Sequence, residues 1–322
     1  MRLGKLDNDE LERLVLSKFH PKRKESLAAP EIGVDCAALD LENDIAVLST
    51  DPITSSSPAN LGRLSVHVSC NDAAAAGAEP VGLLVTLLAP PTATKEQIDM
   101  VANDLAKAAS EANVDILGGH TEVTDSVTRM VTNTTVLARI GRNRMLKGLQ
   151  PGDDLVMTKW AGLEGSAIIA EDYADRLCNV TEEEIATAKS FSRYFSVVPE
   201  GLYAADHGAT AMHDVTEGGI CGAAWEMSYA AGLGIELWTD RIPVLPETLH
   251  ICRAVGIDPL RLISSGSMLI SCPDGTAMVE GLKAEGIAAV IVGKVAGDGL
   301  HTKDGVKIDP PGADELYCLF PS

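Results

Sequence analysis

The chain has 322 residues, a formal net charge of −20 at pH 7, and contents of 46% apolar and 4% aromatic residues. This length exceeds one typical core and suits two domains. Nucleic-acid binders neutralise phosphates with clustered Lys and Arg and often stack bases on aromatic side chains, so the composition argues against a nucleic-acid partner. The acidic balance also disfavours anionic membranes. The longest apolar stretch, residues 81–91, has about half the length of a membrane span.

The cysteine pattern indicates a reducing compartment. The chain has seven cysteines, an odd number, and no two of them stand in a CxxC pair. Neither a disulfide framework nor a zinc site is therefore predicted. The N-terminal residues are acidic and lack the apolar core of a secretory signal. We expect a cytoplasmic protein with no membrane association.

The first predicted elements alternate between helices and strands. Capping-box spacing at Asp7 and Glu10 predicts a helix that ends near Phe19. A buried strand is expected over residues 45–48, ending at Ser49-Thr50-Asp51-Pro52. A helix follows over residues 61–76, with Gly77 as its C-terminal cap, and then a strand over residues 81–89.

The next elements complete the first half. Thr94 and Gln97 form a second capping box, which predicts a helix to about Asn113. A short strand over residues 114–117 is expected to stop at Gly118-Gly119, and Val- and Thr-rich residues 127–140 predict another strand. Residues 142–152 are basic, lack periodicity and contain a Pro-Gly turn. We therefore expect a domain boundary there, giving domains 1–148 and 149–322.

The second half again mixes helices and strands. Strands are predicted near residues 154–158, 209–214, 234–239, 266–271 and 288–295, and helices after residue 162 and near 182–195, 200–207, 246–255 and 274–285. Neither half is a strict series of strand–helix–strand units. The predicted fold class is α+β, in two mixed α/β domains.

Acidic residues recur where strands should end or helices begin, namely at Asp35, Asp51, Asp72, Asp214 and Glu217. Small neighbours would let a ligand approach closely. Gathered carboxylates suit Mg²⁺, which prefers oxygen ligands and often keeps substrate phosphates. The alternative is that each acid caps a helix or closes a turn.

Two glycine pairs stand after predicted strands, at Gly118-Gly119 and at Gly218-Gly219. Backbone N–H groups in such segments can surround a phosphate. Neither pair belongs to a Walker A loop or a GxGxxG fingerprint, so each could equally be a tight turn. His120 follows the first pair, and an ordinary hydrogen-bonded loop histidine is the simpler interpretation.

Six motifs in order carry a resemblance to a known family: GVDCAA (33–38), STDP (49–52), VSCNDAAAAGAEP (68–80), GGHTE (118–122), GDDLVMT (152–158) and HDVTEGG (213–219). This series resembles the PurM-like superfamily of aminoimidazole-ribonucleotide (AIR) synthase-related proteins, and HypE-like members most closely. The resemblance implies a PurM-like N-terminal ATP-binding domain that forms a β-barrel with a partner copy. It also implies a PurM C-terminal-like domain, and hence a homodimer.

The resemblance also implies roles for single residues. Asp35, Asp51 and Asp72 match the acids that hold Mg²⁺ and the phosphates of ATP, and Asn71 stands beside them. Gly118, Gly119, His120 and Thr121 match a nucleotide-contacting segment, with His120 as a catalytic candidate. Asp214 matches a catalytic acid, with Thr216, Gly218 and Gly219 lining the cleft. The implied chemistry is ATP-dependent phosphoryl transfer to an oxygen of a small-molecule, carbamoyl-type or protein-borne acceptor.

The chain departs from the family pattern at both ends. Val34 replaces one of two adjacent acids, and the Pro-Arg-Ile-Cys tail of HypE-like members is absent. Cys318 is instead predicted to be a packed thiol. Three alternatives stay open: a small-molecule kinase similar to thiamine-monophosphate kinase, a non-catalytic nucleotide-binding scaffold, and a two-metal phosphohydrolase. The last ranks lowest, because the expected His-rich ligand spacing is missing.

Overall fold

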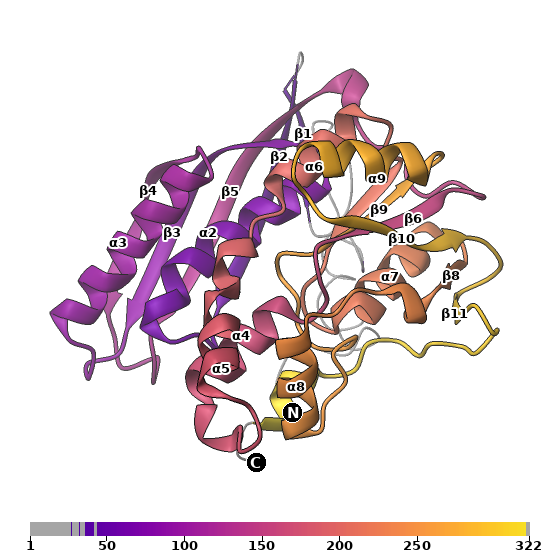
Figure 1. Cartoon of the computed structure of the whole chain (residues 1–322). Helices are drawn as coiled ribbons and strands as arrows, with labels where there is room; N and C mark the ends of the chain where they lie inside the picture. Colours follow the sequence, from indigo (N-terminus) through magenta and orange to yellow (C-terminus); the bar gives the residue numbers. More distant parts are fainter. Residues whose placement is uncertain (1–26, 28–31, 33–35, 42–43, 320–322) are drawn as a thin grey trace.

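The computed structural model describes residues 27, 32, 36–41 and 44–319. The helix expected between Asp7 and Phe19 lies outside these residues. Two mixed sheets, one in each half of the chain, form two α/β domains that meet along helix α2 (Pro58–Ala75) (Figure 1). The predicted two-domain α+β class is confirmed.

The N-terminal domain is built on a five-stranded sheet. In sheet order its strands are β1 (Ala37–Leu41), β2 (Asp44–Ile53), β5 (Val131–Gly141), β3 (Glu79–Ala89) and β4 (Asp115–Val123). Neighbours are antiparallel except β3 and β4, which are parallel. Alternate residues of β5 are buried, so one face of the sheet packs on helix α2. No element among the described residues packs on the other face, which we call the open face. On the open face Leu84 and Leu137 are 52% and 39% exposed.

Two strands of this sheet were predicted too short, and a third was not predicted. Strand β2 runs past residue 48 to Ile53, so Asp51 lies within a strand, and β1 was not predicted. Strand β4 continues through Gly118-Gly119 to Val123. A Cβ atom at Gly119, where φ is +150°, would lie 1.8 Å from the Val85 carbonyl oxygen. The glycine therefore permits close approach of two strands, and does not end one.

The C-terminal domain has a six-stranded sheet. Its order is β11 (Leu300–Thr302), β8 (Ile235–Leu237), β10 (Ala289–Val295), β6 (Asp154–Thr158), β9 (Met268–Cys272) and β7 (Ala211–Asp214). Five of these match predicted strands, and β11 was missed. The main helices are α4 (Leu163–Asp172), α5 (Glu182–Lys189), α6 (Val198–Asp206), α7 (Gly219–Ala231), α8 (Pro246–Val255) and α9 (Gly275–Ala284).

Helix α2 is buried on nearly every side. From Leu61 to Ala75 every residue except Arg63 is buried, so the helix is enclosed by protein around its whole circumference. On one side it contacts β2, β5 and α3 (Lys95–Glu111), and on the other it contacts α6 and β7. A Cβ atom at Gly201 of α6 would lie 2.6 Å from the Ala74 carbonyl oxygen, so the two helices are in backbone contact.

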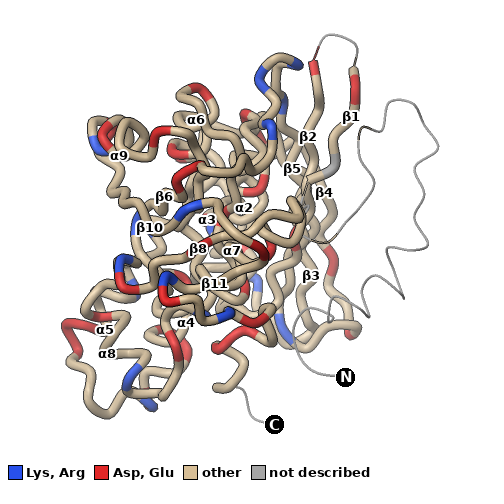
Figure 2. The backbone as a smooth tube through the Cα atoms, turned by 90° about the vertical axis from the view of Figure 1, so that its right-hand side faces the viewer, with Lys and Arg blue, Asp and Glu red and all other residues tan. Residues whose placement is uncertain are grey.

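Charge is distributed over the whole surface. Figure 2 shows Asp and Glu on many helices and loops, with Lys and Arg scattered among them. In the part of the chain that the structure describes, no helix is long and apolar enough to span a bilayer.

Candidate functional site

Two of the predicted acids meet between β2 and α2. The Ser49 hydroxyl donates a hydrogen bond to the carboxylate of Asp72, which is buried, and its oxygen lies 3.4 Å from the carboxylate of Asp51. Both acids therefore face the space between sheet and helix. Burial, together with the neighbouring charge of Asp72, raises the pKa of the Cys70 thiol to about 12. This thiol is consequently an unreactive core group.

Asp72 also borders a cavity of about 260 Å³ between the domains. His213, the residue before Asp214 on β7, lines the opposite side of the cavity. The His213 Nδ1 atom lies 2.6 Å from the Asp214 carbonyl oxygen, and Nε2 lies 3.3 Å from the Glu226 carboxylate. The cavity thus lies between an acid of the first domain and the strand that ends in the acid of the second. Its other lining residues are Cys36, Ala38, Val47, Ala75, Ala76, Ile140, Met145, Leu146 and Met212.

The loop after β7 is fixed by backbone contacts. The Val215 N–H donates to the Ser267 carbonyl, and the Gly219 N–H donates to that of half-buried Thr216. Gly218 and Gly219 have φ values of +83° and +61°, which favour glycine. The Gly218 N–H already donates to the Asp314 carboxylate at 2.7 Å. The Asp314 carboxylate of the same chain therefore occupies the N-terminus of α7, where a phosphate was expected.

The Gly118–Thr121 segment lies elsewhere. Asp51, Thr134, Val85 and Gly119 occupy one row across the first sheet, so Asp51 and Gly119 are about 14 Å apart at ordinary strand spacing. The His120 side chain is 66% exposed on the open face of the sheet, near Glu122. Asp214 is buried in the other domain. Within one protomer the structure does not bring the two catalytic candidates together.

Asn71 and Asp35 stand apart from the acid pair for different reasons. Asp35 and Val34 lie outside the described residues. Asn71 is fully buried, and its amide bonds the backbone of Phe195 and Val197 in the second domain.

The donor set fits Mg²⁺. Among the described residues no group of three or more His, Cys, Asp or Glu is arranged to hold a metal. Mg²⁺ is, however, often bound through one or two carboxylates plus substrate phosphates and waters. The facing carboxylates of Asp51 and Asp72 satisfy that requirement.

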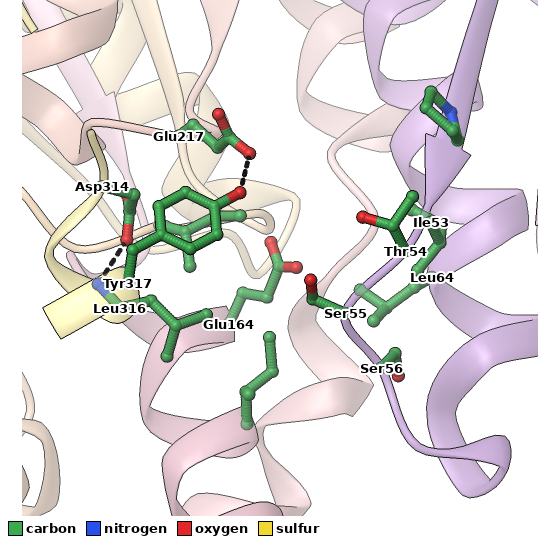
Figure 3. A pocket seen from close by; sticks show the side chains of 13 residues that line it. Ile53, Thr54, Ser55, Ser56, Leu64, Glu164, Glu217, Asp314, Leu316 and Tyr317 are labelled. Carbon is green, nitrogen blue, oxygen red and sulfur yellow. Dashed lines mark hydrogen bonds between the residues drawn. The ribbon is translucent and has the colours of Figure 1, made fainter. Parts of the chain in front are cut away.

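A second, smaller cavity was not predicted. It has a volume of about 80 Å³ and lies between the β2–α2 loop and the second domain (Figure 3). Glu164 and Ser55 face each other across it in Figure 3. The Tyr317 hydroxyl donates to the Glu217 carboxylate at 2.7 Å, and Asp314 accepts from the Leu316 N–H at 2.8 Å. The three acids Glu164, Glu217 and Asp314 therefore line one pocket, together with Leu316 and Tyr317 from the C-terminal part of the chain.

Two of the acids in this pocket, Glu164 and Asp314, have raised pKa values. Burial, followed by repulsion from Asp314 and Glu217, raises the pKa of Glu164 to about 7. Burial likewise raises the pKa of Asp314 to about 6, against hydrogen bonds from backbone N–H groups. Burial and the Glu217 charge raise the pKa of Tyr317. At neutral pH the pocket is therefore partly protonated.

Some of these residues carried a sequence signal. Glu164 is the lone acid at the start of the apolar run Leu163–Ala170, and a buried Glu of this kind rarely lacks a specific environment. Nothing in the sequence indicated that Asp314 would cap α7. The packed Cys318 was predicted wrongly: its thiol is exposed, because the 3₁₀ helix η6 (Glu315–Leu319) turns Leu316 and Leu319 inward at three-residue spacing.

The fold and the paired acids define an AIR synthase-related protein. The chain belongs to that family: the models for the N-terminal and C-terminal domains of AIR synthase related proteins match residues 33–140 and 150–303. A putative hydrogenase expression/formation protein of Methanocaldococcus jannaschii is 28% identical over 66% of this chain and 62% of its own length. The chain thus covers less than two thirds of that relative. The carbamoyl dehydratase HypE of Cupriavidus necator is 27% identical over 75% of this chain and 69% of its own.

Solved structures show the same fold. AaThiL complexed with AMPPCP and TMP has a TM-score of 0.78 at 18% identity, covering 98% of both chains. The HypE–HypF complex has a TM-score of 0.74 at 22% sequence identity, and the match covers 94% of this chain and 99% of that chain. HypE in complex with ATP has a TM-score of 0.72 at 20% sequence identity, and the match covers 94% of this chain and 92% of that chain. The predicted resemblance to PurM-like and HypE-like proteins is confirmed.

Proposed function

We propose that the protein is an ATP-binding, Mg²⁺-dependent enzyme that activates an oxygen of an acceptor by phosphoryl transfer. The observation that carries this proposal is the Asp51–Ser49–Asp72 arrangement beside the interdomain cavity. The HypE relatives and the ATP-bound HypE structure support it. A carbamoyl-type acceptor, small or protein-borne, suits the carbamoyl dehydratase relatives and the HypE–HypF complex.

The chain's own residues would act mainly by positioning. Asp51 and Asp72, with Asp35 by motif, would hold Mg²⁺, which when bound neutralises phosphate charge. Gly118, Gly119 and Thr121 are proposed to contact nucleotide along β4. Asp214 is proposed to orient or deprotonate the acceptor, with Thr216, Gly218 and Gly219 shaping the loop around it.

A homodimer accounts for the position of His120. The open face of the first sheet displays Leu84 and Leu137, and no described element of the chain packs on it. Pairing this face with a second copy would bury these side chains and bring His120 of one protomer to its partner. We propose such a dimer, with the domain boundary after residue 148. A cytoplasmic location is supported by the cysteine pattern, an odd number of cysteines with no CxxC pair.

A small-molecule kinase is the second candidate. The similarity in fold to AaThiL favours it. The two activities differ in product, because a kinase leaves a phosphorylated acceptor whereas a dehydratase or synthetase releases phosphate.

Calorimetric titration with ATP, in Mg²⁺ and again in EDTA, tests the proposal. We expect Mg²⁺-dependent binding at micromolar affinity, about −8 kcal/mol. A screen of carbamoyl and alcohol acceptors, read out by ³¹P spectroscopy, then separates phosphate release from acceptor phosphorylation. Absence of binding in both buffers would contradict the proposal. Binding without turnover of any acceptor would favour a scaffold.

A further inference from the structure

A four-residue segment of the second domain, residues 194–197, passes between the two domains. We call it the bridge segment. It starts at Tyr194, the last residue of the 3₁₀ helix η4 (Ser190–Tyr194), and leads into α6. The side chains of Phe195 and Val197 are buried. The segment is therefore enclosed, and its backbone polar groups need partners inside the protein.

The first domain supplies two of these partners through one side chain. The Asn71 Nδ2 atom donates to the Phe195 carbonyl at 2.8 Å, and the Val197 N–H donates to Asn71 Oδ1 at 2.8 Å. Both ends of the amide are thus used on neighbouring parts of the bridge segment. Asn71 is also fully buried, so a nucleotide could reach its remaining donor and acceptor positions only if the segment moved.

The second domain holds the same segment from the other side. The Lys159 ammonium donates to the carbonyls of Tyr194 at 3.0 Å and Ser196 at 2.6 Å, and it forms an ion pair with Glu200 at 2.6 Å. Lys159 is the residue after β6 and has φ of +54°, a conformation that is uncommon for a side chain other than glycine. Three acceptors surround the cation, and they explain why this conformation is kept.

The bridge segment is also in close contact with the loop before β9. A Cβ atom at Gly266 would lie 2.5 Å from the Tyr194 carbonyl oxygen, so the loop before β9 is in backbone contact with the segment. Strand β9 lies between β6 and β7 in the sheet, and β7 ends at Asp214. The bridge segment therefore connects the helix carrying Asp72 to the strands that place Asp214.

We propose that Asn71 is a positioning residue: together with Lys159 it holds the bridge segment, and thereby fixes Asp72 relative to Asp214. Asn71 and Asp72 are consecutive on one helix, so a shift of either moves the other. The role in nucleotide binding rests on the function proposed above. The clamp itself, defined as Asn71, Lys159 and residues 194–197, is a property of the fold and can be tested separately.

A double-mutant cycle on Mg·ATP affinity, measured by calorimetry on the full chain, tests the positioning role. We expect Asn71→Ala and Lys159→Met each to weaken binding, by about 10-fold, because small misplacements of site groups have effects of this size or larger. The double variant should be no weaker than about the worse single one, since both act through one segment. Lys159→Arg keeps cationic donors at this position, so this variant should retain most of the wild-type affinity for Mg·ATP.

Matched controls separate positioning from general destabilisation. Ser166→Ala removes a buried hydrogen bond to Thr248 in the same domain without touching the bridge segment, and should leave affinity unchanged. If Asn71→Ala weakens binding while Lys159→Met does not, Asn71 contacts the nucleotide directly and the proposal is overturned. The proposal would also be overturned if the double variant lost as much Mg·ATP binding free energy as the two single variants together. Asn71→Ser serves as the second variant if the alanine protein does not fold.

Amide hydrogen exchange distinguishes failure of the clamp from failure of the proposed function. In either single variant, exchange at Val197 should accelerate at least about 10-fold relative to the core strand β9, because a local hydrogen bond or its support is lost. Unchanged exchange would overturn the clamp even if ATP binds. If the wild-type protein binds no Mg·ATP, the proposed function fails and so does the role of Asn71 in it, whereas accelerated exchange would still establish the clamp.

Discussion

The hydroxyl of Ser49 on β2 donates to the carboxylate of Asp72 on α2, which lies 23 residues further along the chain. This bond joins sheet to helix at the point where Asp51 also faces inward. Asp72→Asn keeps an oxygen that can accept the bond and removes only the charge. We therefore expect the free energy of unfolding to change little. The affinity for Mg·ATP should fall at least about 10-fold, or 1.4 kcal/mol. Calorimetry checks this result. Asp125→Asn, at an exposed turn, is the control, and an equal loss there would count against a specific site.

Asp214→Asn should act on turnover more than on binding. The carboxylate is buried at the end of β7 and belongs to the domain opposite the proposed metal ligands. Loss of a positioned acid or base commonly lowers rates by about 100-fold or more. We expect kcat to fall by that order while ATP affinity changes less than about 3-fold, measured by acceptor-dependent turnover and calorimetry. A parallel loss of both would argue for a binding role.

Stability should decline as pH rises through neutrality. The pKa of Glu164 is about 7 in the folded protein and that of Asp314 about 6, both above their ordinary values of 4.5 and 3.8. Between the ordinary and raised values the native state binds more protons than the unfolded state, so the free energy of unfolding falls as pH increases. The contribution is fully present below about pH 4 and is lost by about pH 8.

Glu164→Gln tests this pH dependence. The amide stays uncharged, so the variant should be more stable than wild type at pH 8, by on the order of 2 kcal/mol, with a flatter profile between pH 5 and 8. Denaturant unfolding at several pH values measures it. Glu280→Gln, on the exposed face of α9, removes one charge without burial and should leave the profile unchanged. A wild-type profile that rises from pH 5 to 8 would contradict the assignment.

Gly219 and Gly232 form a matched pair for measuring steric cost. Gly219 is the first residue of α7 and Gly232 is the C-terminal cap that follows it, with φ values of +61° and +63°. A Cβ atom at Gly219 would lie 2.6 Å from the Leu260 carbonyl oxygen, whereas one at Gly232 would meet nothing within 4 Å. Gly232→Ala should cost about 1 kcal/mol for left-handed backbone. Gly219→Ala should cost a few kcal/mol more, measured by denaturant unfolding. Equal losses of stability in the two variants would mean that the loop containing Leu260 can shift at little energetic cost.

Leu84→Lys should shift the proposed dimer toward monomer. Leu84 is half-exposed on the open face of the first sheet. Placing a charge within an apolar interface without a partner is strongly unfavourable. Sedimentation velocity should show a lower mass at low micromolar concentration. Val306→Lys, at an apolar side chain that is 63% exposed on the second domain, should keep the wild-type mass. A monomeric wild-type protein would contradict the dimer.

Periodicity and caps predicted most helices and strands because those signals are local. The Thr94–Gln97 capping box lies where it was expected. Strand ends were harder to predict. The continuation of β4 through Gly118-Gly119 depends on the close approach of Val85 on a neighbouring strand, a tertiary contact that no local pattern carries.

The acid pair illustrates the same limit at the site. Family motifs placed Asp51 and Asp72 near one another, and the structure joins them through Ser49. The motif pattern could not show that Asn71, the neighbour of Asp72, uses its amide on Phe195 and Val197, because the partners lie more than 120 residues away. Asp314 likewise reaches Gly218 across 96 residues. Such partners follow from how the two domains pack.

One hydrophobic core extends through both domains along α2. It contains Ile45, Leu61 and Val136 from the first domain, and Val197, Met268 and Leu282 from the second. The second domain has a further core of its own, around Leu155, Ile235 and Val292. The apolar residues of the shared core that line α2 are nevertheless enclosed only when both halves are present, although each half matches a separate family domain. Heating or denaturant should consequently unfold the chain in one cooperative transition, with no intermediate that retains a single intact domain. Either half expressed alone would expose one side of α2 or the surface that covers it, and should aggregate.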